Sequence, residues 1–226
     1  MQLDVRALSK VYSLRRGLLS ASFTVAKGEL VAVVGHNGAG KSTLLKLLAN
    51  ALVPDGGEAF VEGISLVRRV EIVRLVGYIP EIPNLYDLFS VEYNLRLFSR
   101  LFGCEKGRVE EILAEFELGP YRRSPVATLS KGLRQRVNIG RSLLADPPIL
   151  LLDEPTSGLD FEMTGEMYRL IHRLHEQGKT ILFTSHRPEE VRSLATRILV
   201  LHQGAIVFDG TGDEYFKSGF HEKLYV

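Results

Sequence analysis

The fold is decided by the stretch Gly35-His36-Asn37-Gly38-Ala39-Gly40-Lys41-Ser42-Thr43, which follows the pattern G-x-x-x-x-G-K-[ST]. Glycines in such a turn let successive backbone N–H groups converge on a polyphosphate, whereas larger side chains would block that approach. The apolar run 30–34 before the stretch predicts a buried strand, and the run 42–48 after it predicts a helix. This strand–loop–helix context places the positive end of a helix dipole under the phosphates.

The residue types of this loop indicate separate roles. Lys41 is expected to reach the β- and γ-phosphates, and the Ser42 hydroxyl is expected to ligate Mg²⁺. The candidate nucleotide-binding residues of the loop are Gly35, Asn37, Gly38, Ala39, Gly40, Lys41, Ser42 and Thr43. The alternative is an ordinary glycine-rich turn, which the flanking strand and helix argue against.

Composition sets the class of protein. With 226 residues, 45% of them hydrophobic and 24% charged, the chain fits one globular α/β domain. A net charge of +1 gives no global field that would favour nucleic acid, so no nucleic-acid partner is expected. The single cysteine, Cys104, excludes an internal disulfide and fits a reducing compartment.

Hydropathy predicts a cytoplasmic location. The apolar runs are far shorter than the roughly 18 residues that a membrane-spanning helix needs. Residues 1–30 lack the apolar segment of a signal peptide. We therefore expect contact with a membrane only through a partner.

Apolar patterning predicts the order of elements. Strands are expected at 5–12, 21–25, 30–34, 58–61, 76–79, 148–152, 180–184, 198–202 and 205–208. Helices are expected at 42–48, 90–102, 107–117, 134–145, 161–177 and from 188 to 194. The alternation indicates an α/β fold with a mostly parallel core sheet and an antiparallel β addition near the N-terminus. The single domain would divide into a core, 1–81 and 129–226, and a helical subdomain, 82–128.

Two adjacent carboxylates, Asp153 and Glu154, follow the apolar run 149–152. Ligands of open α/β sheets bind at the carboxyl ends of the strands, so these side chains should face the phosphates. Asp153 would hold Mg²⁺, directly or through water, and Glu154 would polarise the attacking water as general base. The alternative is a pair of surface acids after a strand, which is less expected beside a phosphate loop.

A third motif, Leu129-Ser130-Lys131-Gly132-Leu133, precedes a predicted helix, and here the chain resembles the ATP-binding cassette (ABC) ATPase family. The family's signature is L-S-G-G-Q, so Ser130 and Gly132 match it, whereas Lys131 and Leu133 depart from it. In the family this motif faces the γ-phosphate held by a partner subunit. The resemblance implies a P-loop NTPase fold, ATP and Mg²⁺ as ligands, and a homodimer with two ATP molecules at its interface.

The resemblance extends to further positions along most of the chain. Tyr12 stands where the family has an aromatic side chain that stacks on adenine; the alternative is a strand residue packed on a neighbour. The stretch 157–160 matches the family's D-loop, although Asp160 also suits a helix N-cap. His186 matches the switch histidine that contacts the γ-phosphate, and it joins Lys41 and Glu154 as a candidate catalytic residue.

One departure concerns Glu81, in Tyr78-Ile79-Pro80-Glu81, because the family usually has glutamine there. A carboxylate at this position can still ligate Mg²⁺ or orient water, but it adds negative charge near the phosphates. The variant stretches 81–95, 129–132 and 204–210 resemble stand-alone ATPase subunits of bacterial exporters of drugs, antibiotics, heme-type or sodium-type cargo.

The resemblance implies the ATP-binding and ATP-hydrolysing subunit of an ABC transporter, with an exporter favoured. ATP would close a head-to-tail dimer, and hydrolysis would reopen it and drive a separate integral-membrane subunit. The protein would then lie at the inner face of the cell membrane through that subunit. The contact would be a groove along 81–93, whose apolar residues seat a coupling helix or, alternatively, belong to the subdomain core: Pro83, Leu85, Tyr86, Leu88 and Phe89.

Two other hypotheses about the function stay open. A soluble single-cassette ABC ATPase, for example in cofactor assembly, stays open because it too is a single cassette. A nucleotide-gated module without turnover is disfavoured by the intact catalytic candidates. The aromatic residues of the C-terminal stretch could pack on the core or on a partner; they are Tyr215, Phe216, Phe220 and Tyr225.

Overall fold

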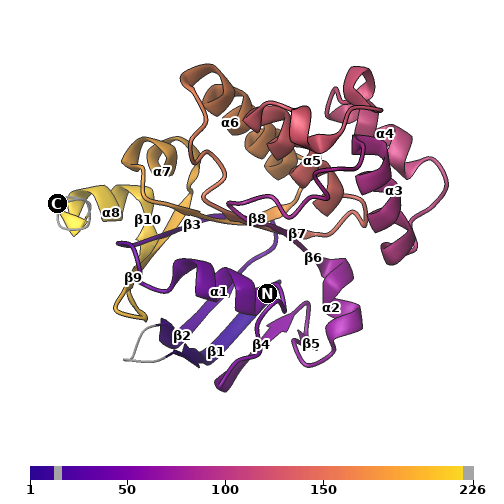
Figure 1. Ribbon diagram of the computed structural model, residues 1–226. Helices are drawn as coiled ribbons and strands as arrows, with labels where there is room; N and C mark the ends of the chain where they lie inside the picture. The colour runs from indigo at the N-terminus through magenta and orange to yellow at the C-terminus, as the bar shows by residue number, and fades with distance from the viewer. Residues whose placement is uncertain (13–16, 221–226) are drawn as a thin grey trace.

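The computed structural model of the chain describes residues 1–12 and 17–220, which form one ten-stranded sheet with helices on both faces (Figure 1). The strands are β1 (Leu3–Val11), β2 (Gly17–Val25), β3 (Leu30–Val34), β4 (Gly56–Val61), β5 (Ile64–Ser65), β6 (Val76–Ile79), β7 (Ile149–Asp153), β8 (Thr180–Ser185), β9 (Arg197–His202) and β10 (Ala205–Thr211). The α-helices are α1 (Lys41–Leu48), α2 (Arg69–Leu75), α3 (Val91–Phe102), α4 (Arg108–Glu115), α5 (Lys131–Ser142), α6 (Phe161–Glu176), α7 (Pro188–Leu194) and α8 (Gly212–Lys217).

The sheet has the order β5-β4-β1-β2-β10-β9-β3-β8-β7-β6. Its core strands run parallel, from β9 through β3, β8 and β7 to β6. The N-terminal strands pair antiparallel, as β1 with β2 and with β4, and the β9–β10 hairpin is also antiparallel. The expected fold class, a mostly parallel core with an antiparallel addition, is confirmed.

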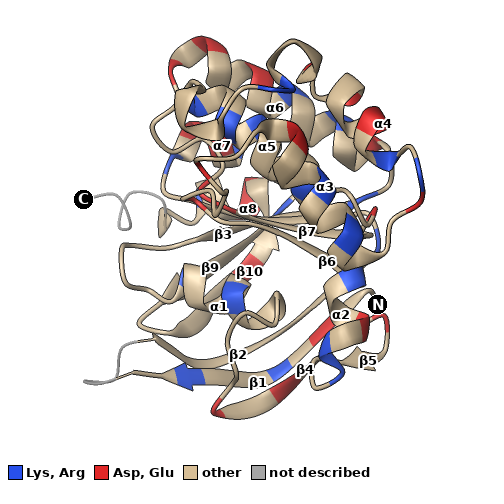
Figure 2. Cartoon of the chain, turned by 45° about the vertical axis from the view of Figure 1, so that its right-hand side comes forward, with Lys and Arg blue, Asp and Glu red and all other residues tan. Residues whose placement is uncertain are grey.

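The core strands are continuous apolar runs because both faces of the sheet are covered. Alternate residues of β3 face opposite sides: Leu30, Ala32 and Val34 join the core under α3 to α7. Val31 and Val33 join a second core, in which α1 is enclosed between the parallel strands and the antiparallel β1, β2 and β4 (Figures 1 and 2). Basic and acidic residues are interspersed along the outer helices (Figure 2).

The segment 82–128 is helical and packs onto the core. It contains α3, α4 and two short 3₁₀ turns, Gly119–Tyr121 and Val126–Thr128. The buried residues Ile112 and Leu113 of α4, together with Phe116 directly after it, share one hydrophobic cluster with α5 and α6. Arg122 ties this segment together, because its guanidinium pairs with Glu92 of α3 and Glu110 of α4 at 2.6 and 2.7 Å. The division into a core and a helical subdomain stays a prediction.

Some elements differ from the sequence-based expectation. The helix α5 begins at Lys131 instead of residue 134, because the Ser130 hydroxyl caps it by accepting the Leu133 N–H at 3.3 Å. The helix α2 was not expected, since Ile72 is its one buried residue and gives no apolar periodicity. Neither β5, of two residues, nor α8 was expected; α8 starts with a capping box of Thr211 and Glu214.

The C-terminal stretch packs on the core as far as it is described. Tyr215 is buried, and its ring lies 5.9 Å from that of Phe208 in β10, centroid to centroid. Phe220 also packs on Phe208, whereas Tyr225 lies outside the described residues. None of the helices within residues 1–12 and 17–220 combines the length and the hydrophobicity of a membrane-spanning segment.

The close packing of α5 on α4 leads to a first prediction. A Cβ added to Gly140 would lie 2.7 Å from Ile112 Cγ2, which cannot swing away because isoleucine is stiff at χ1. Alanine gains about 1 kcal/mol in helix propensity, but overpacking costs about 1–3 kcal/mol. We expect Gly140→Ala to lower the free energy of unfolding, measured by urea denaturation.

The matched control is Gly165→Ala in α6, where the nearest atom to an added Cβ is Arg169 Nη1 at 3.6 Å. This variant should gain about 0.5–1 kcal/mol from propensity alone. An equal gain in both variants would contradict the packing described.

Candidate active site

The loop between β3 and α1 needs glycine at two positions. A Cβ on Gly35 would lie 2.3 Å from the Leu201 carbonyl oxygen, and one on Gly40 would lie 2.6 Å from that of Gly17. Gly40 also has φ 107°, which L residues rarely adopt. No side chain caps α1 and no acidic residue lies in its first turn. The N–H groups at this helix start are therefore available to an anion.

Lys41 is held inside the loop. Its side chain is buried, and the Nζ donates to the carbonyl oxygens of Gly35 at 2.7 Å and His36 at 3.3 Å. Burial lowers the pKa of Lys41, while the nearby carboxylates of Glu154 and Asp153 act in the opposite direction. A cation thus lies between the loop and the two acids.

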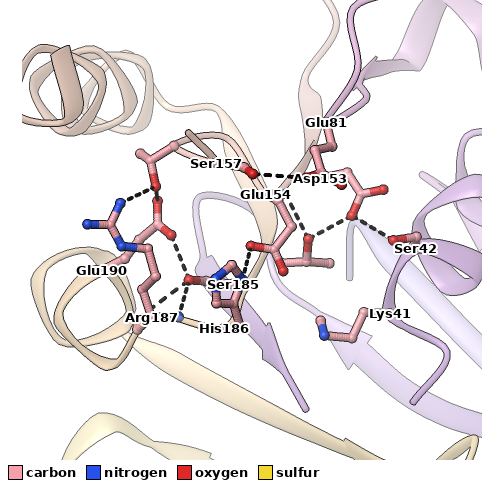
Figure 3. A network of polar contacts seen from close by, with 12 residues as sticks. Lys41, Ser42, Glu81, Asp153, Glu154, Ser157, Ser185, His186, Arg187 and Glu190 are labelled. Atoms are coloured by element: carbon pink, nitrogen blue, oxygen red, sulfur yellow. Dashed lines mark hydrogen bonds and ion pairs between the residues drawn. The ribbon is translucent and has the colours of Figure 1, made fainter. Parts of the chain in front are cut away.

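Asp153, at the end of β7, is the centre of the site (Figure 3). Its buried carboxylate accepts hydrogen bonds from three hydroxyls: Ser42 at 3.0 Å, Thr184 at 2.7 Å and Tyr78 at 3.3 Å. These hydroxyls come from α1, β8 and β6. Burial, with Asp153 adding to the effect, raises the pKa of Tyr78, so the phenol stays a donor.

Glu154 pairs with His186 directly after the strands end. The Glu154 Oε2 lies 2.8 Å from His186 Nδ1, and the Glu154 N–H donates to Thr184 Oγ1 at 2.9 Å. Glu154 has φ 48°, an unusual value for this residue type that turns its side chain away from the strand. The side chain of Glu154 is 12% exposed and that of His186 is 55% exposed, so the pair faces solvent from the histidine side.

Glu81 lies beside the site but bonds elsewhere. Its Oε1 accepts a hydrogen bond from the Ser157 hydroxyl at 2.9 Å (Figure 3). This contact joins the end of β6 to the turn that precedes Asp160. A role of Glu81 as metal ligand stays a prediction.

The remaining candidates lie apart from this cluster. Among the described residues, no hydrogen bond or ion pair joins Ser130, Gly132 or Asp160 to the phosphate loop. Asp160 caps α6 by accepting the Met163 N–H at 2.8 Å, which was the structural alternative. Gly132 lies under Met163, where an added Cβ would overlap the methionine side chain. Tyr12 is 45% exposed.

Sequence reasoning missed five polar residues around the site. Two are the hydroxyls of Tyr78 and Thr184 on Asp153, which depend on the pairing of β6 and β8 with β7. The others form one group: Glu190 of α7 accepts hydrogen bonds from Thr156 at 2.9 Å and Ser185 at 2.6 Å. A glutamate in the first turn of a helix is ordinary, so no local signal marked Glu190 as buried.

A comparison with known families identifies the chain. The family model described as ABC transporter matches residues 18–157, more than half of the sequence. The chain belongs to the ABC transporter family. The resemblance first indicated by residues 129–133 is thereby confirmed, and ATP-hydrolysing activity follows from this membership.

Similar proteins agree with this family assignment, since they are named as ATP-binding proteins. It is 36% identical over 215 residues to the ABC transporter ATP-binding protein NatA of Bacillus subtilis, with 92% of this chain and 87% of the relative covered. It is 36% identical over 217 residues to the daunorubicin resistance ATP-binding protein DrrA3 of Streptomyces coeruleorubidus, with 94% and 69% covered.

Solved structures of ABC proteins share the fold. An ATP-binding subunit of an ABC transporter superposes with a TM-score of 0.88 at 31% identity, covering 100% of this chain and 98% of the other. A dimeric ATP-binding cassette in a post-hydrolysis state, bound to ADP and Pi, has a TM-score of 0.82 at 26% identity, covering 92% and 98%. That state supports ATP hydrolysis by this fold.

The position of Thr184 between the two acids leads to a prediction. Thr184→Val keeps the shape but removes the hydroxyl that donates to Asp153 and accepts the Glu154 N–H. The lost bonds should lower the free energy of unfolding by about 1–3 kcal/mol. Misplacement of the acids should lower kcat for phosphate release by about tenfold.

The control is Tyr78→Phe, which removes one longer hydrogen bond to Asp153, at 3.3 Å. Its effect on both quantities should be smaller. Wild-type stability and turnover in Thr184→Val would show that the two acids do not depend on this residue.

Proposed function

We propose that this protein is the ATP-hydrolysing subunit of an ABC exporter and drives a separate integral-membrane subunit through ATP-dependent dimer closure. The observation that carries the proposal is the cluster of Lys41, Asp153, Glu154 and His186 at the ends of three neighbouring strands. A cation, a buried acid, a base and an imidazole beside an uncapped helix start are the groups that phosphoryl transfer to water requires.

The proposed reaction follows from these positions. The N–H groups of the loop and the Lys41 ammonium bind the β- and γ-phosphates of ATP. Glu154 orients a water molecule and takes its proton as the water oxygen bonds to the γ-phosphorus. The bond from the γ-phosphorus to the bridging oxygen breaks, and ADP leaves. His186, whose Nδ1 contacts Glu154, would contact the γ-phosphate with the rest of its ring.

The donor set of the site fits Mg²⁺. The Ser42 hydroxyl and the Asp153 carboxylate lie 3.0 Å apart, and both are the hard oxygen ligands that this ion prefers. Mg²⁺ commonly binds through one or two carboxylates together with substrate phosphates, so Ser42 and Asp153 would suffice, with Glu81 as a further candidate. When bound, the ion would neutralise charge on the β- and γ-phosphate oxygens.

A second copy of the chain would complete the proposed site. Ser130, at the start of α5, is exposed and not bonded to the phosphate loop of its own chain. A helix N-terminus with a hydroxyl can bind the γ-phosphate of another subunit. The dimeric cassette among the similar structures supports this arrangement, in which Ser130, Gly132 and Asp160 would face the partner's ATP.

The proposed contact with the membrane subunit lies along the residues after β6. A groove of about 580 Å³ is lined by Leu85, Tyr86, Phe98 and Phe102 among others. Large apolar side chains stay exposed beside it, including Leu88 at 87% and Phe89 at 46%. Exposed apolar patches of this kind mark interaction sites. Such a partner would hold the protein at the inner face of the cell membrane.

The exporter assignment rests on the names of the relatives. They include a drug-resistance ATP-binding protein and the Nod factor export ATP-binding protein I of Rhizobium etli. These names support export for this chain and leave its cargo open.

The proposed general base is tested by Glu154→Gln, which keeps the shape but removes the group that accepts the proton. We expect phosphate release to fall by about 10²- to 10⁴-fold. ATP affinity should be retained, because Lys41 and the loop are unchanged. Hydrolysis at the wild-type rate would contradict the assignment.

The partner is tested with the same variant, tagged and loaded with ATP to hold the closed dimer. It is recovered from detergent-solubilised cells of its source, and the co-purifying proteins are identified. A polytopic membrane protein is expected. Recovery of soluble partners alone would overturn the transporter assignment in favour of a soluble cassette such as a cofactor-assembly ATPase.

A further inference from the structure

Glu190 is a carboxylate that the hydrolytic reaction does not use and that is nevertheless completely buried. Its exposed fraction is 0%, and Asp153 is the one other buried carboxylate among the described residues. Removing a charge from water costs several kcal/mol unless the protein supplies strong partners. A buried acid whose partners adjoin the reaction centre therefore calls for a physical reason.

The partners of Glu190 come from the two loops that carry the hydrolytic pair. Its Oε2 accepts the Ser185 hydroxyl at 2.6 Å, and its Oε1 accepts the Thr156 hydroxyl at 2.9 Å; both hydroxyls are buried. Ser185 directly precedes His186 at the end of β8, and Thr156 follows Glu154 by two residues after β7. One carboxylate on α7 thus links both loops (Figure 3).

Each oxygen of Glu190 accepts one of these hydrogen bonds. The Ser185 oxygen accepts the Arg187 N–H at 2.9 Å, and the Thr156 oxygen accepts from Arg187 Nη1 at 3.4 Å. The proton of each hydroxyl can then point to Glu190, which lies closer to the Ser185 oxygen, at 2.6 Å, than the Arg187 carbonyl oxygen does, at 3.5 Å. A carboxylate satisfies both donors, whereas an amide offers one accepting oxygen and one donating nitrogen.

We propose that Glu190 is a positioning residue, which holds Glu154 and His186 at hydrogen-bond distance for ATP hydrolysis by fixing Thr156 and Ser185. His186 is largely exposed, so packing of its own ring cannot fix its place. The 2.8 Å contact between Glu154 Oε2 and His186 Nδ1 depends instead on the backbone of the two loops. This inference rests on the proposed roles of Glu154 and His186.

The test is Glu190→Gln, which keeps volume but offers one acceptor to two donors. We expect kcat for ATP hydrolysis to fall by about ten- to hundredfold, the range that follows from a small misplacement of catalytic groups. KM and the Kd for ATP should stay within about twofold, because Lys41 and its loop are untouched. A merely structural role would lower binding and turnover together.

Glu189→Gln is the matched control, since Glu189 is the exposed neighbour on the same helical turn. It should keep wild-type kcat and Kd. Ser185→Ala removes one of the two donors and should lower kcat without changing Kd. The double variant Ser185→Ala with Glu190→Gln should lose less than the product of the two single losses, because both belong to one network.

Each result decides the proposal. Wild-type kcat in Glu190→Gln overturns it, and so does a loss that disappears when activity is divided by the fraction of folded, ATP-binding protein. Glu154→Gln is measured in parallel. If Glu154→Gln keeps full turnover, the proposed reaction fails; if it is inactive while Glu190→Gln is fully active, the positioning role alone fails.

Discussion

The structure depends on how one buried carboxylate, Asp153, is satisfied. An uncompensated buried charge is strongly unfavourable, and three hydroxyls from α1, β6 and β8 compensate this one. The same contacts fix those three elements against the end of β7. The phosphate loop, which leads into α1, is thereby placed opposite Glu154, the residue that follows Asp153. The hydrogen bonds that compensate the buried charge of Asp153 therefore also set the geometry of the site.

Much of the fold and of the site could be predicted, because the motifs that decide them are local in sequence. The glycine pattern of 35–43 and the acids that end the apolar run 149–152 each determine their own turn. Their meeting, across 111 residues, follows from a parallel sheet, whose strands all end at one edge. The antiparallel N-terminal strands and the β9–β10 hairpin followed from turn residues in the same way.

The features that the sequence did not predict depend on strand register and on how deeply a side chain is buried. The hydroxyl of Tyr78 reaches Asp153 because β6 pairs with β7 so that Tyr78 lies opposite Leu151, and a single sequence does not encode that register. The burial of Glu190 arises where α7 packs behind β8, far from any local pattern. Ser130 and Asp160 show a different limit: each is a helix cap within one chain, and a second role requires a partner.

The central claim is that Asp153 joins ATP and Mg²⁺ to this network. Its most direct test is calorimetry of ATP binding to Glu154→Gln, with and without Mg²⁺, repeated after adding Asp153→Asn. The account predicts that Mg²⁺ strengthens binding when Asp153 is present. With Asp153→Asn, metal-free binding should be retained while the gain from Mg²⁺ is lost. The same Mg²⁺-dependent gain in both proteins would contradict the account.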